Sequence, residues 1–386
     1  MSKELTSEVF GFYPVPPVAI KAERYGRIRE MMDREGLDAL VVCSSAGLVG
    51  RGNLRFMTNY SPVTRFAAAV FPRRGEPVLL VPYVVHQFWA GSVSWVEDIR
   101  LALDYGAEVP KALAEAGVVG GRVGLVGMEF MPPSFVPSIR QSLPRIELVS
   151  VAEQYARVRL IKGPTDIAIM KNSATIADRV FGELLATIKS GLTENEIYAR
   201  AEYLLRLQGC EGSLVLISST AETGLPIPSA RKVQPGDALQ ISLEPIGPGG
   251  YLVQIVRTVF LGEPSPQARE VYGICLRAQI EAERALGPGR KVSEVAAIGQ
   301  EVLQGTPFGP RAMQKVPFGH GMGVELGEPP RIAGDDPTVL EPSMAIVLHP
   351  NLYVDGIGVF IGDTYLITNS GVDRLSSTRR DLMVLP

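Results

Sequence analysis

Apolar residues in the first part of the chain switch between helical spacing and short continuous runs. Tyr25, Ile28 and Met31 recur at three-residue steps before Gly36, which predicts a helix that ends at this glycine. In all, the spacing predicts helices over residues 22–35 and 109–116, and apolar β-branched runs predict buried strands over residues 37–43, 67–71, 77–81, 123–127 and 146–149. Strands that alternate with helical patterns indicate a small α/β domain over residues 1–155.

Pairs of helical patterns followed by strand patterns characterise the rest of the chain, residues 156–386. Apolar residues at three- and four-residue steps from Ile167 to Ile188 predict a long helix, and Thr193 with Glu196 forms a capping box that opens the next one. Further helices are predicted over residues 267–286 and 293–303, and strands over residues 213–218, 238–243, 254–260, 345–349 and 358–368. This order of elements predicts an α+β domain.

Length and composition narrow the class of protein. A chain of 386 residues is expected to hold two domains, because single cores stop growing near about 250–300 residues. A net charge of -3 argues against nucleic acid and anionic membranes as partners, since both favour a basic protein. The three cysteines lie far apart in apolar surroundings, so we expect buried thiols. With no signal-peptide pattern and no uncharged run of the about 18 residues that a membrane helix needs, we expect a cytoplasmic protein.

The stretch richest in reactive groups runs from Pro317 to Arg331. It holds His320, one of three histidines in the chain, with glycine on both sides. Glycine lets a ligand or another backbone approach closely, which suits an exposed reactive ring. Glu325 and Arg331 follow within a dozen positions. The alternative is a glycine-rich turn that contains one hydrogen-bonded histidine, and this stretch alone leaves that alternative open.

Several spaced motifs follow one another in a fixed order along residues 155–386. They are Arg159-Leu160-Ile161-Lys162-Gly163-Pro164-Thr165-Asp166, residues 234–241, Gly250-Tyr251 followed by Val256-Arg257-Thr258, Gly319-His320-Gly321-Met322-Gly323 with Glu328-Pro329-Pro330, and the strand patterns at 344–350 and 358–364. Together with the α/β domain that precedes them, these motifs resemble the creatinase, aminopeptidase P and prolidase family. The resemblance implies an N-terminal creatinase-like α/β domain, residues 1–155, and a C-terminal pita-bread catalytic domain, residues 156–386.

The peptidases of this family bind two metal ions through two aspartates, one histidine and two glutamates. In this sequence the matching positions hold Ser242, Gln254, His320, His349 and Gly362, so of the five family ligands only the histidine remains. Divalent cations favour oxygen-rich, negatively charged clusters. The resemblance therefore implies that the chain has no dinuclear metal site, and no cofactor is expected.

Creatinase, in the same family, cleaves a C–N bond of a small guanidino acid without a metal, and this chain resembles it in lacking the ligands. Arg331 stands where creatinase has an arginine that holds the substrate carboxylate. Arg65 lies near the place where the family's N-terminal domain offers a second arginine to the partner subunit. The resemblance implies a homodimer.

These observations predict a metal-independent, creatinase-like hydrolase that cleaves a C–N bond of a small, carboxylate-bearing nitrogen compound, and they disfavour peptidase activity. His320 and His349 are the expected acid/base pair, since a neutral imidazole can take and return a proton, and Gln254 is expected to hydrogen-bond the reacting group. The other candidate substrate-binding residues are Arg331, Arg65, Ser242, Glu325 and Glu244. Two alternatives stay open: a metal-free lyase or decarboxylase on the same scaffold, and an inactive Xaa-Pro peptidase homologue that acts as a binding protein.

Overall fold

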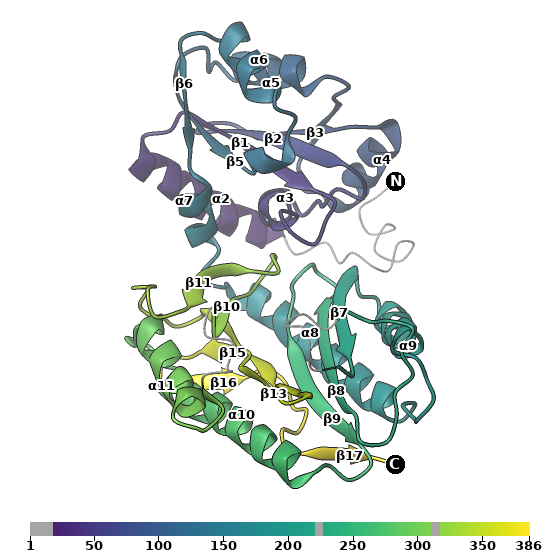
Figure 1. Cartoon of the computed structure of the whole chain (residues 1–386). Coiled ribbons are helices and arrows are strands. Elements are labelled where there is room, and N and C mark those ends of the chain that lie inside the picture. Colours follow the sequence, from purple (N-terminus) through teal and green to yellow (C-terminus); the bar gives the residue numbers. More distant parts are fainter. Residues whose placement is uncertain (1–17, 221–226, 310–316) are drawn as a thin grey trace. The chain divides into compact units, whose positions relative to one another are not determined.

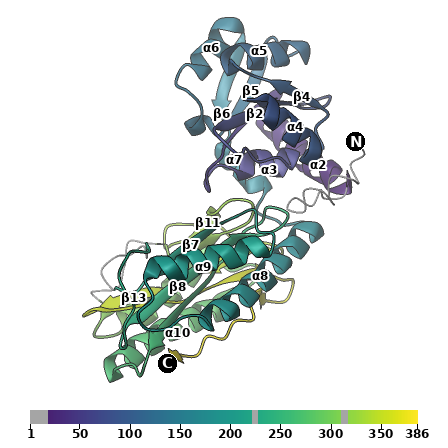
Figure 2. The ribbon, with the colours of Figure 1, turned by 90° about the vertical axis from the view of Figure 1, so that its right-hand side faces the viewer.

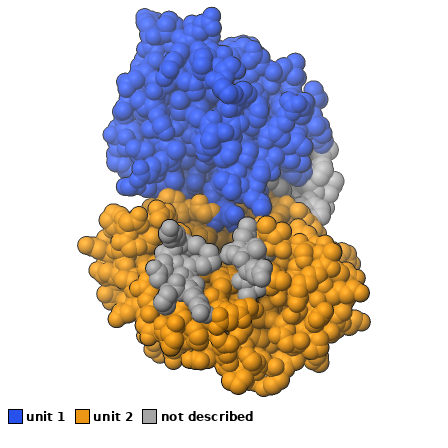
Figure 3. Space-filling model, in the orientation of Figure 1, with its two compact units in different colours: residues 1–159, 324–326 blue, residues 160–323, 327–386 orange. Residues whose placement is uncertain are grey.

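The computed structural model describes residues 18–220, 227–309 and 317–386. Its contacts divide the chain into two compact units, which Figure 3 colours separately. Unit 1 is Met1–Arg159 with Val324–Leu326, and unit 2 is Leu160–Gly323 with Gly327–Pro386. Within the three described ranges, no helix is long and apolar enough to cross a membrane.

Unit 1 is built around a six-stranded mixed sheet in the order β4-β3-β2-β1-β5-β6. The central strand β1 pairs antiparallel with β2 and parallel with β5. Its run from Ala39 to Cys43 is fully buried, as expected for a strand covered on both faces. The strands are β1 (Ala39–Ser45), β2 (Phe66–Pro72), β3 (Val78–Val81), β4 (Asp98–Leu101), β5 (Gly121–Val126) and β6 (Ile146–Ser150). The helices are α2 (Val18–Glu35), α3 (Gly52–Thr58), α4 (Val84–Val93), α5 (Tyr105–Glu115), α6 (Phe135–Ser142) and α7 (Ala152–Val158), with a 3-10 turn η1 (Met128–Phe130).

Unit 2 contains a nine-stranded sheet whose main path runs β11-β10-β12-β15-β9-β8-β7, with β16 beside β15 and β17 beside β9. A separate two-stranded sheet joins β13 and β14. The strands are β7 (Gly212–Ser218), β8 (Ala238–Ile246), β9 (Ile255–Leu261), β10 (Gly319–Gly321), β11 (Glu328–Ile332), β12 (Ala345–Leu348), β13 (Asn351–Val354), β14 (Ile357–Phe360), β15 (Gly362–Ile367), β16 (Val372–Arg374) and β17 (Met383–Leu385). The helices are α8 (Pro164–Leu185), α9 (Glu194–Leu207), α10 (Pro266–Ala285) and α11 (Val292–Gln304).

Strand β8 presents apolar side chains to one face of the sheet and polar side chains to the other. Leu239, Ile241 and Leu243 pack into a core cluster with α8 and α9. Because side chains alternate along a strand, the intervening polar residues point to the opposite face. Helix α8 contacts β8 and α9 contacts β7, whereas α10 contacts β12, β13 and β14, an arrangement visible in Figures 1 and 2. Helices therefore cover the outside of the sheet, and the polar side chains of β8 face inward.

The predicted pattern of elements agrees closely with the structure in several places. The helix predicted from Ile167 to Ile188 is α8, and the Thr193 hydroxyl and Glu196 carboxylate make the reciprocal capping-box bonds at the start of α9. One strand prediction is wrong: residues 358–368 form two strands, β14 and β15, which pair with different partners. The short helix α3 was not predicted, because it lacks an apolar–polar alternation and every one of its residues is buried.

Candidate active site

His320 and His349 lie side by side at one end of unit 2. His320 sits on β10, opposite Val347 of β12, and His349 directly follows β12. The centroids of the two rings are 5.1 Å apart. His320 Nδ1 lies 2.9 Å from the carbonyl oxygen of Gly321. Because a carbonyl can only accept, Nδ1 carries the proton, and Nε2 of the neutral ring is left as a hydrogen-bond acceptor.

Burial keeps both imidazoles neutral. Removal from water lowers the pKa of His320 below its usual value. The pKa of His349 falls further, to about 3, through the same loss of water and through the neighbouring His320. Nδ1 of His349 is buried and has no hydrogen-bond partner among the residues that the structure describes. His349 is therefore a neutral hydrogen-bonding group at ordinary pH, and its expected place in an acid/base pair stays a prediction.

Three buried polar residues form a second cluster on the inward face of the sheet. Ser242 and Glu244 come from β8, two positions apart, and Gln254 comes from the residue before β9. The Ser242 hydroxyl and the Gln254 amide Nε2 both donate to Glu244 Oε1, at 2.9 Å and 2.8 Å. Burial raises the pKa of Glu244 to about 7, although these two hydrogen bonds oppose the increase. An acid that titrates near neutral pH in a buried cluster is a candidate functional group.

A chain of backbone and side-chain contacts joins the cluster to the histidines. Thr364 Oγ1 accepts from the Gln254 backbone N–H at 2.8 Å and donates to its carbonyl at 3.2 Å. Thr364 lies on β15 opposite Val347 of β12, and Val347 lies opposite His320. Thr364 was not among the predicted site residues. The only signal for it in the sequence was its place in the strand motif at 358–364.

The remaining predicted residues occupy different surroundings. Arg331 lies opposite His320 in the β10–β11 register, and its side chain is mostly exposed, 3.6 Å from Asp335. Glu325 belongs to unit 1, where its carboxylate accepts from the backbone N–H groups of Gly50 and Gly52, at 2.9 Å and 2.5 Å. It therefore caps the start of α3. Arg65 also belongs to unit 1, and its guanidinium lies 5.4 Å from the centre of the Tyr83 ring.

Directly behind the site, a buried ion pair joins β9 to β15. Arg257 Nη2 lies 2.7 Å from Asp363 Oδ1, and both side chains are 0% exposed. Arg257 also donates to the carbonyl oxygens of Gly362 and Thr378, each at 2.8 Å. Val256 and Gly362 pair across β9 and β15. Arg257 is the next residue after Val256, and Asp363 is the next residue after Gly362. Because successive side chains alternate between faces, Arg257 and Asp363 point to the face opposite the site.

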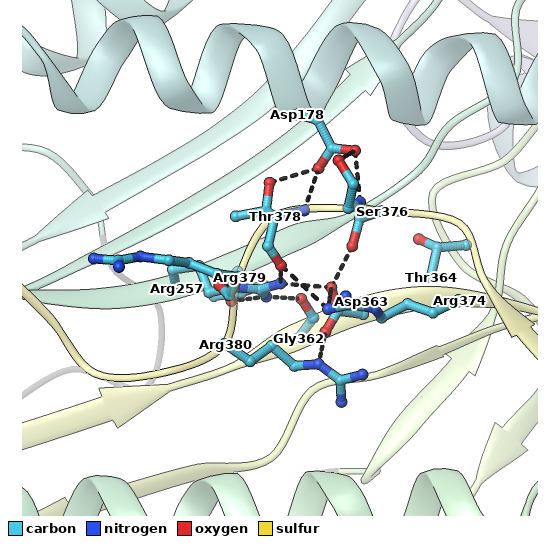
Figure 4. A network of polar contacts seen from close by, with 12 residues as sticks. Asp178, Arg257, Gly362, Asp363, Thr364, Arg374, Ser376, Thr378, Arg379 and Arg380 are labelled. Atoms are coloured by element: carbon cyan, nitrogen blue, oxygen red, sulfur yellow. Dashed lines mark hydrogen bonds and ion pairs between the residues drawn. The ribbon is translucent and has the colours of Figure 1, made fainter.

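The same ion pair holds the segment that follows β16. Figure 4 shows Asp363 between Arg257, the Ser376 hydroxyl and Arg380. In the same view, Asp178 on α8 accepts from the backbone and hydroxyl groups of residues 377 and 378. This network joins β9, which begins directly after Gln254, to β15, which begins at Gly362. The charge at position 257, within a strand that is apolar apart from Arg257 and Thr258, is the local sign of this network in the sequence.

Two family models match the chain. Metallopeptidase family M24 matches residues 168–369, and the creatinase/prolidase N-terminal domain matches residues 24–161. The chain is 32% identical to an Xaa-Pro dipeptidase of Pyrococcus furiosus over 255 residues, which are 65% of this chain and 72% of that protein. It is 28% identical to an Xaa-Pro dipeptidase of Pyrococcus horikoshii over 370 residues, which are 94% of this chain and 99% of that protein.

Solved structures show the same two-domain fold. The prolidase from Pyrococcus horikoshii OT3 superposes with a TM-score of 0.81 at 26% identity, and covers 94% of this chain and 100% of that one. An Xaa-Pro dipeptidase from Bacillus anthracis gives a TM-score of 0.82 at 24% identity, which shows likeness of fold. The chain belongs to metallopeptidase family M24, with a creatinase/prolidase N-terminal domain followed by a pita-bread domain. The predicted family and fold class are confirmed.

The predicted activity is wrong. The sequence had indicated a metal-independent, creatinase-like hydrolase of non-peptide bonds and disfavoured peptidase activity. The family is one of metallopeptidases, and the relatives are named as Xaa-Pro dipeptidases. The misjudgement arose because the missing carboxylates were taken to define the reaction.

The residues that the resemblance matches to the family's metal ligands offer few groups that could bind a metal ion. Ser242 is held by Glu244, and Gly362 has no side chain. A Cβ at Gly362 would lie 3.0 Å from the Cβ of His349, so His349 occupies space that a ligand side chain there would need. Among the described residues, no three histidine, cysteine, aspartate or glutamate side chains are grouped to hold a metal ion. These residues do not fit a dinuclear metal centre.

Proposed function

We propose that this chain hydrolyses Xaa-Pro dipeptides or closely similar short peptides. The observation that carries the proposal is the match to the Pyrococcus horikoshii dipeptidase, which extends over 94% of this chain and 99% of that protein. A match of this extent includes both domains, and neither chain has a long unmatched segment that could form a different site. A dipeptide is also a small, carboxylate-bearing nitrogen compound, so the predicted substrate size and charge are retained while the bond that is cleaved changes.

His320 is the proposed proton carrier. Its Nε2 is a free acceptor on a neutral ring, held in place by the bond from Nδ1 to the Gly321 carbonyl. In this proposal, Nε2 takes a proton from a water molecule whose oxygen forms a bond to the peptide carbonyl carbon. The C–N bond then breaks as His320 returns the proton to the leaving proline nitrogen. Because its pKa is lowered, His320 remains an active base at pH values below the about 6.5 of free imidazole.

The other site residues are proposed to hold the substrate. Neutral His349 lies beside His320 and supplies a hydrogen bond to the peptide group. Gln254 and Ser242 position Glu244 through their bonds to its carboxyl group. Arg331, opposite His320 in the sheet register, is suited to the substrate carboxylate because a guanidinium can bind both carboxylate oxygens.

A homodimer and a cytoplasmic location are part of the same proposal. Large apolar side chains of unit 1 are exposed at Val63 and, within six positions of one another, at Tyr83, Val84, Val85 and Phe88, which supports contact with a second copy. Arg65 follows the first of these and would reach the partner subunit in such a dimer. Light scattering at micromolar concentration checks this part, and a monomer that retains full activity would contradict it.

The experiment that tests the function measures free proline released from Gly-Pro and Ala-Pro by the full-length protein, in buffer with added divalent metal and in buffer with chelator. We expect His320→Ala to lower kcat by about 10²- to 10⁴-fold, as for loss of a general acid/base group. Gln304→Ala, on an exposed position of α11, is the matched control and should match the parent. Absence of proline release in both buffers would contradict the proposed function, and a parent-like rate for His320→Ala would contradict the assigned role.

A further inference from the structure

The amide of Gln254 carries an acceptor that nothing in the described part of the chain satisfies. The side chain is 4% exposed. Its Nε2 donates to Glu244 Oε1, which also receives the Ser242 hydroxyl, so the amide faces Glu244 with its nitrogen. Its Oε1 is left buried without a hydrogen-bond partner in the described residues. Buried polar atoms without partners are uncommon and costly, so such an atom indicates a group that arrives with a ligand.

Two further acceptors lie on the same face of the sheet as this oxygen, the Glu244 carboxyl and the His320 ring. Nε2 of His320 is an acceptor because Nδ1 holds the proton. The Glu244 carboxyl makes no ion pair with any described residue. The buried cations that lie near this part of the sheet are already engaged: Lys162 with Glu328 at 3.0 Å, and Arg257 with Asp363 on the opposite face. The pair formed by Gln254 Oε1 and the Glu244 carboxyl is therefore complementary to a donor, and above all to a cationic donor.

We propose that Gln254 Oε1 and the Glu244 carboxyl form a subsite for the protonated amino group of the substrate. The inference rests on the proposed function, because a dipeptide supplies such a group next to the bond that is cleaved. An ammonium carries three N–H donors and one positive charge. It would donate a hydrogen bond to Gln254 Oε1, which has no partner in the described residues, and it would place a positive charge beside the Glu244 carboxyl. Arg331 would then take the carboxylate at the other end of the dipeptide.

The test compares Gly-Pro with propionyl-proline, in which a methyl group replaces the ammonium and the rest of the molecule is unchanged. Binding is measured by calorimetry on full-length protein carrying His320→Ala, with chelator present, so that Gly-Pro is not consumed. We expect Gly-Pro to bind about 10- to 100-fold more tightly, the range for a hydrogen bond to a charged group. Adding Gln254→Met should bring the ratio close to one, and Gln304→Met, the exposed matched control, should leave it unchanged.

Glu244→Gln is the second variant, because it keeps the shape of the side chain and removes its charge. It should also reduce the ratio, and circular dichroism establishes that each variant is folded. A ratio that stays high in both Gln254→Met and Glu244→Gln would overturn the subsite. It would also be overturned if Gly-Pro bound only when manganese was added and Gln254→Met abolished manganese binding, because the acceptors would then serve a metal ion.

A second pair of probes separates failure of the subsite from failure of the proposed function. Glycinamide and propionamide differ by the same ammonium-for-methyl exchange but contain no proline. If neither proline compound binds but glycinamide binds more tightly than propionamide in a Gln254-dependent way, the peptidase proposal fails and the amine subsite stands. If glycinamide and propionamide bind with equal affinity, the proposal of an amine subsite is contradicted, whatever the affinities of Gly-Pro and propionyl-proline.

Discussion

Two polar regions lie on opposite faces of the same strands of unit 2, and they differ in how their groups are paired. In the network around Arg257 and Asp363, the two opposite charges are in contact and bind neighbouring carbonyl and hydroxyl groups (Figure 4). The second oxygen of Asp363 makes no hydrogen bond in the described residues, but it lies 3.4 Å from the Arg380 guanidinium, so it too faces a positive charge. In the cluster around Glu244, the carboxyl has no cation, and both Gln254 Oε1 and His349 Nδ1 lack partners among the described residues. The first arrangement stabilises the sheet, and the second leaves hydrogen-bonding capacity for a ligand.

The largest effect is expected from Asp363→Ala, which leaves the Arg257 charge buried and unpaired. Breaking a buried ion pair by removing one partner costs about 3–5 kcal/mol of the free energy of unfolding. Urea unfolding followed by circular dichroism measures this loss. The control is Glu294→Ala, which breaks the half-exposed pair with Arg290 and should cost less than about 1 kcal/mol. Equal effects in the two variants would mean that burial of the first pair has no structural role.

A smaller effect is expected from pH acting on Glu244. Its pKa is raised from 4.5 to about 7, so the folded protein binds more protons than the unfolded chain between these values. The contribution of Glu244 is therefore fully present below about pH 4.5 and is lost as pH rises through about 7, by up to about 3 kcal/mol. Glu244→Gln does not titrate and should not show this loss.

Comparing the free energy of unfolding of the parent and of Glu244→Gln at pH 5 and pH 7.5 isolates the carboxyl. The lowered pKa of His349 acts with the opposite sign, because its contribution is lost as pH falls below about 6.5, but it is present in both proteins and cancels. If the difference between the two proteins were the same at both pH values, Glu244 would not titrate in the folded state as described here.

The smallest effect is expected from Gln254→Met. The side chain already leaves one buried acceptor unsatisfied, so replacing it with an apolar side chain of similar length removes both a hydrogen bond and a penalty. We expect a change of less than about 1 kcal/mol in the free energy of unfolding. A loss as large as that of Asp363→Ala would show that Gln254 is a structural residue like those of the Arg257 network.

The sequence predicted the local elements and the family, but it could not predict contacts between residues that are distant along the chain. The spacing from Ile167 to Ile188 and the capping box at Thr193 depend on neighbours within a few positions, and both were predicted. The order of motifs identified the family, and the match of the family's ligand positions to residues of this chain stays a prediction. The pairing of Arg257 with Asp363 joins residues 106 positions apart, and no local pattern reports which distant carboxylate a buried arginine meets.

The meaning of the missing ligands was the hardest part to predict. Their absence is visible in the sequence, but the environment of the residues that replaced them is not. Glu244 was a candidate by position alone. Its raised pKa depends on burial, and the orientation of Gln254 depends on a contact between β8 and the start of β9. Likewise, neither the proton position on His320 nor the low pKa of His349 follows from a glycine-rich motif.

The most direct test of the account is a crystal structure of the full-length His320→Ala protein with Gly-Pro bound. The account predicts that the amino nitrogen lies within about 2.7–3.2 Å of Gln254 Oε1 and of a Glu244 oxygen, with the carboxylate at Arg331. A dipeptide bound with its amino group in solvent, or with a metal ion between that group and Gln254, would contradict it.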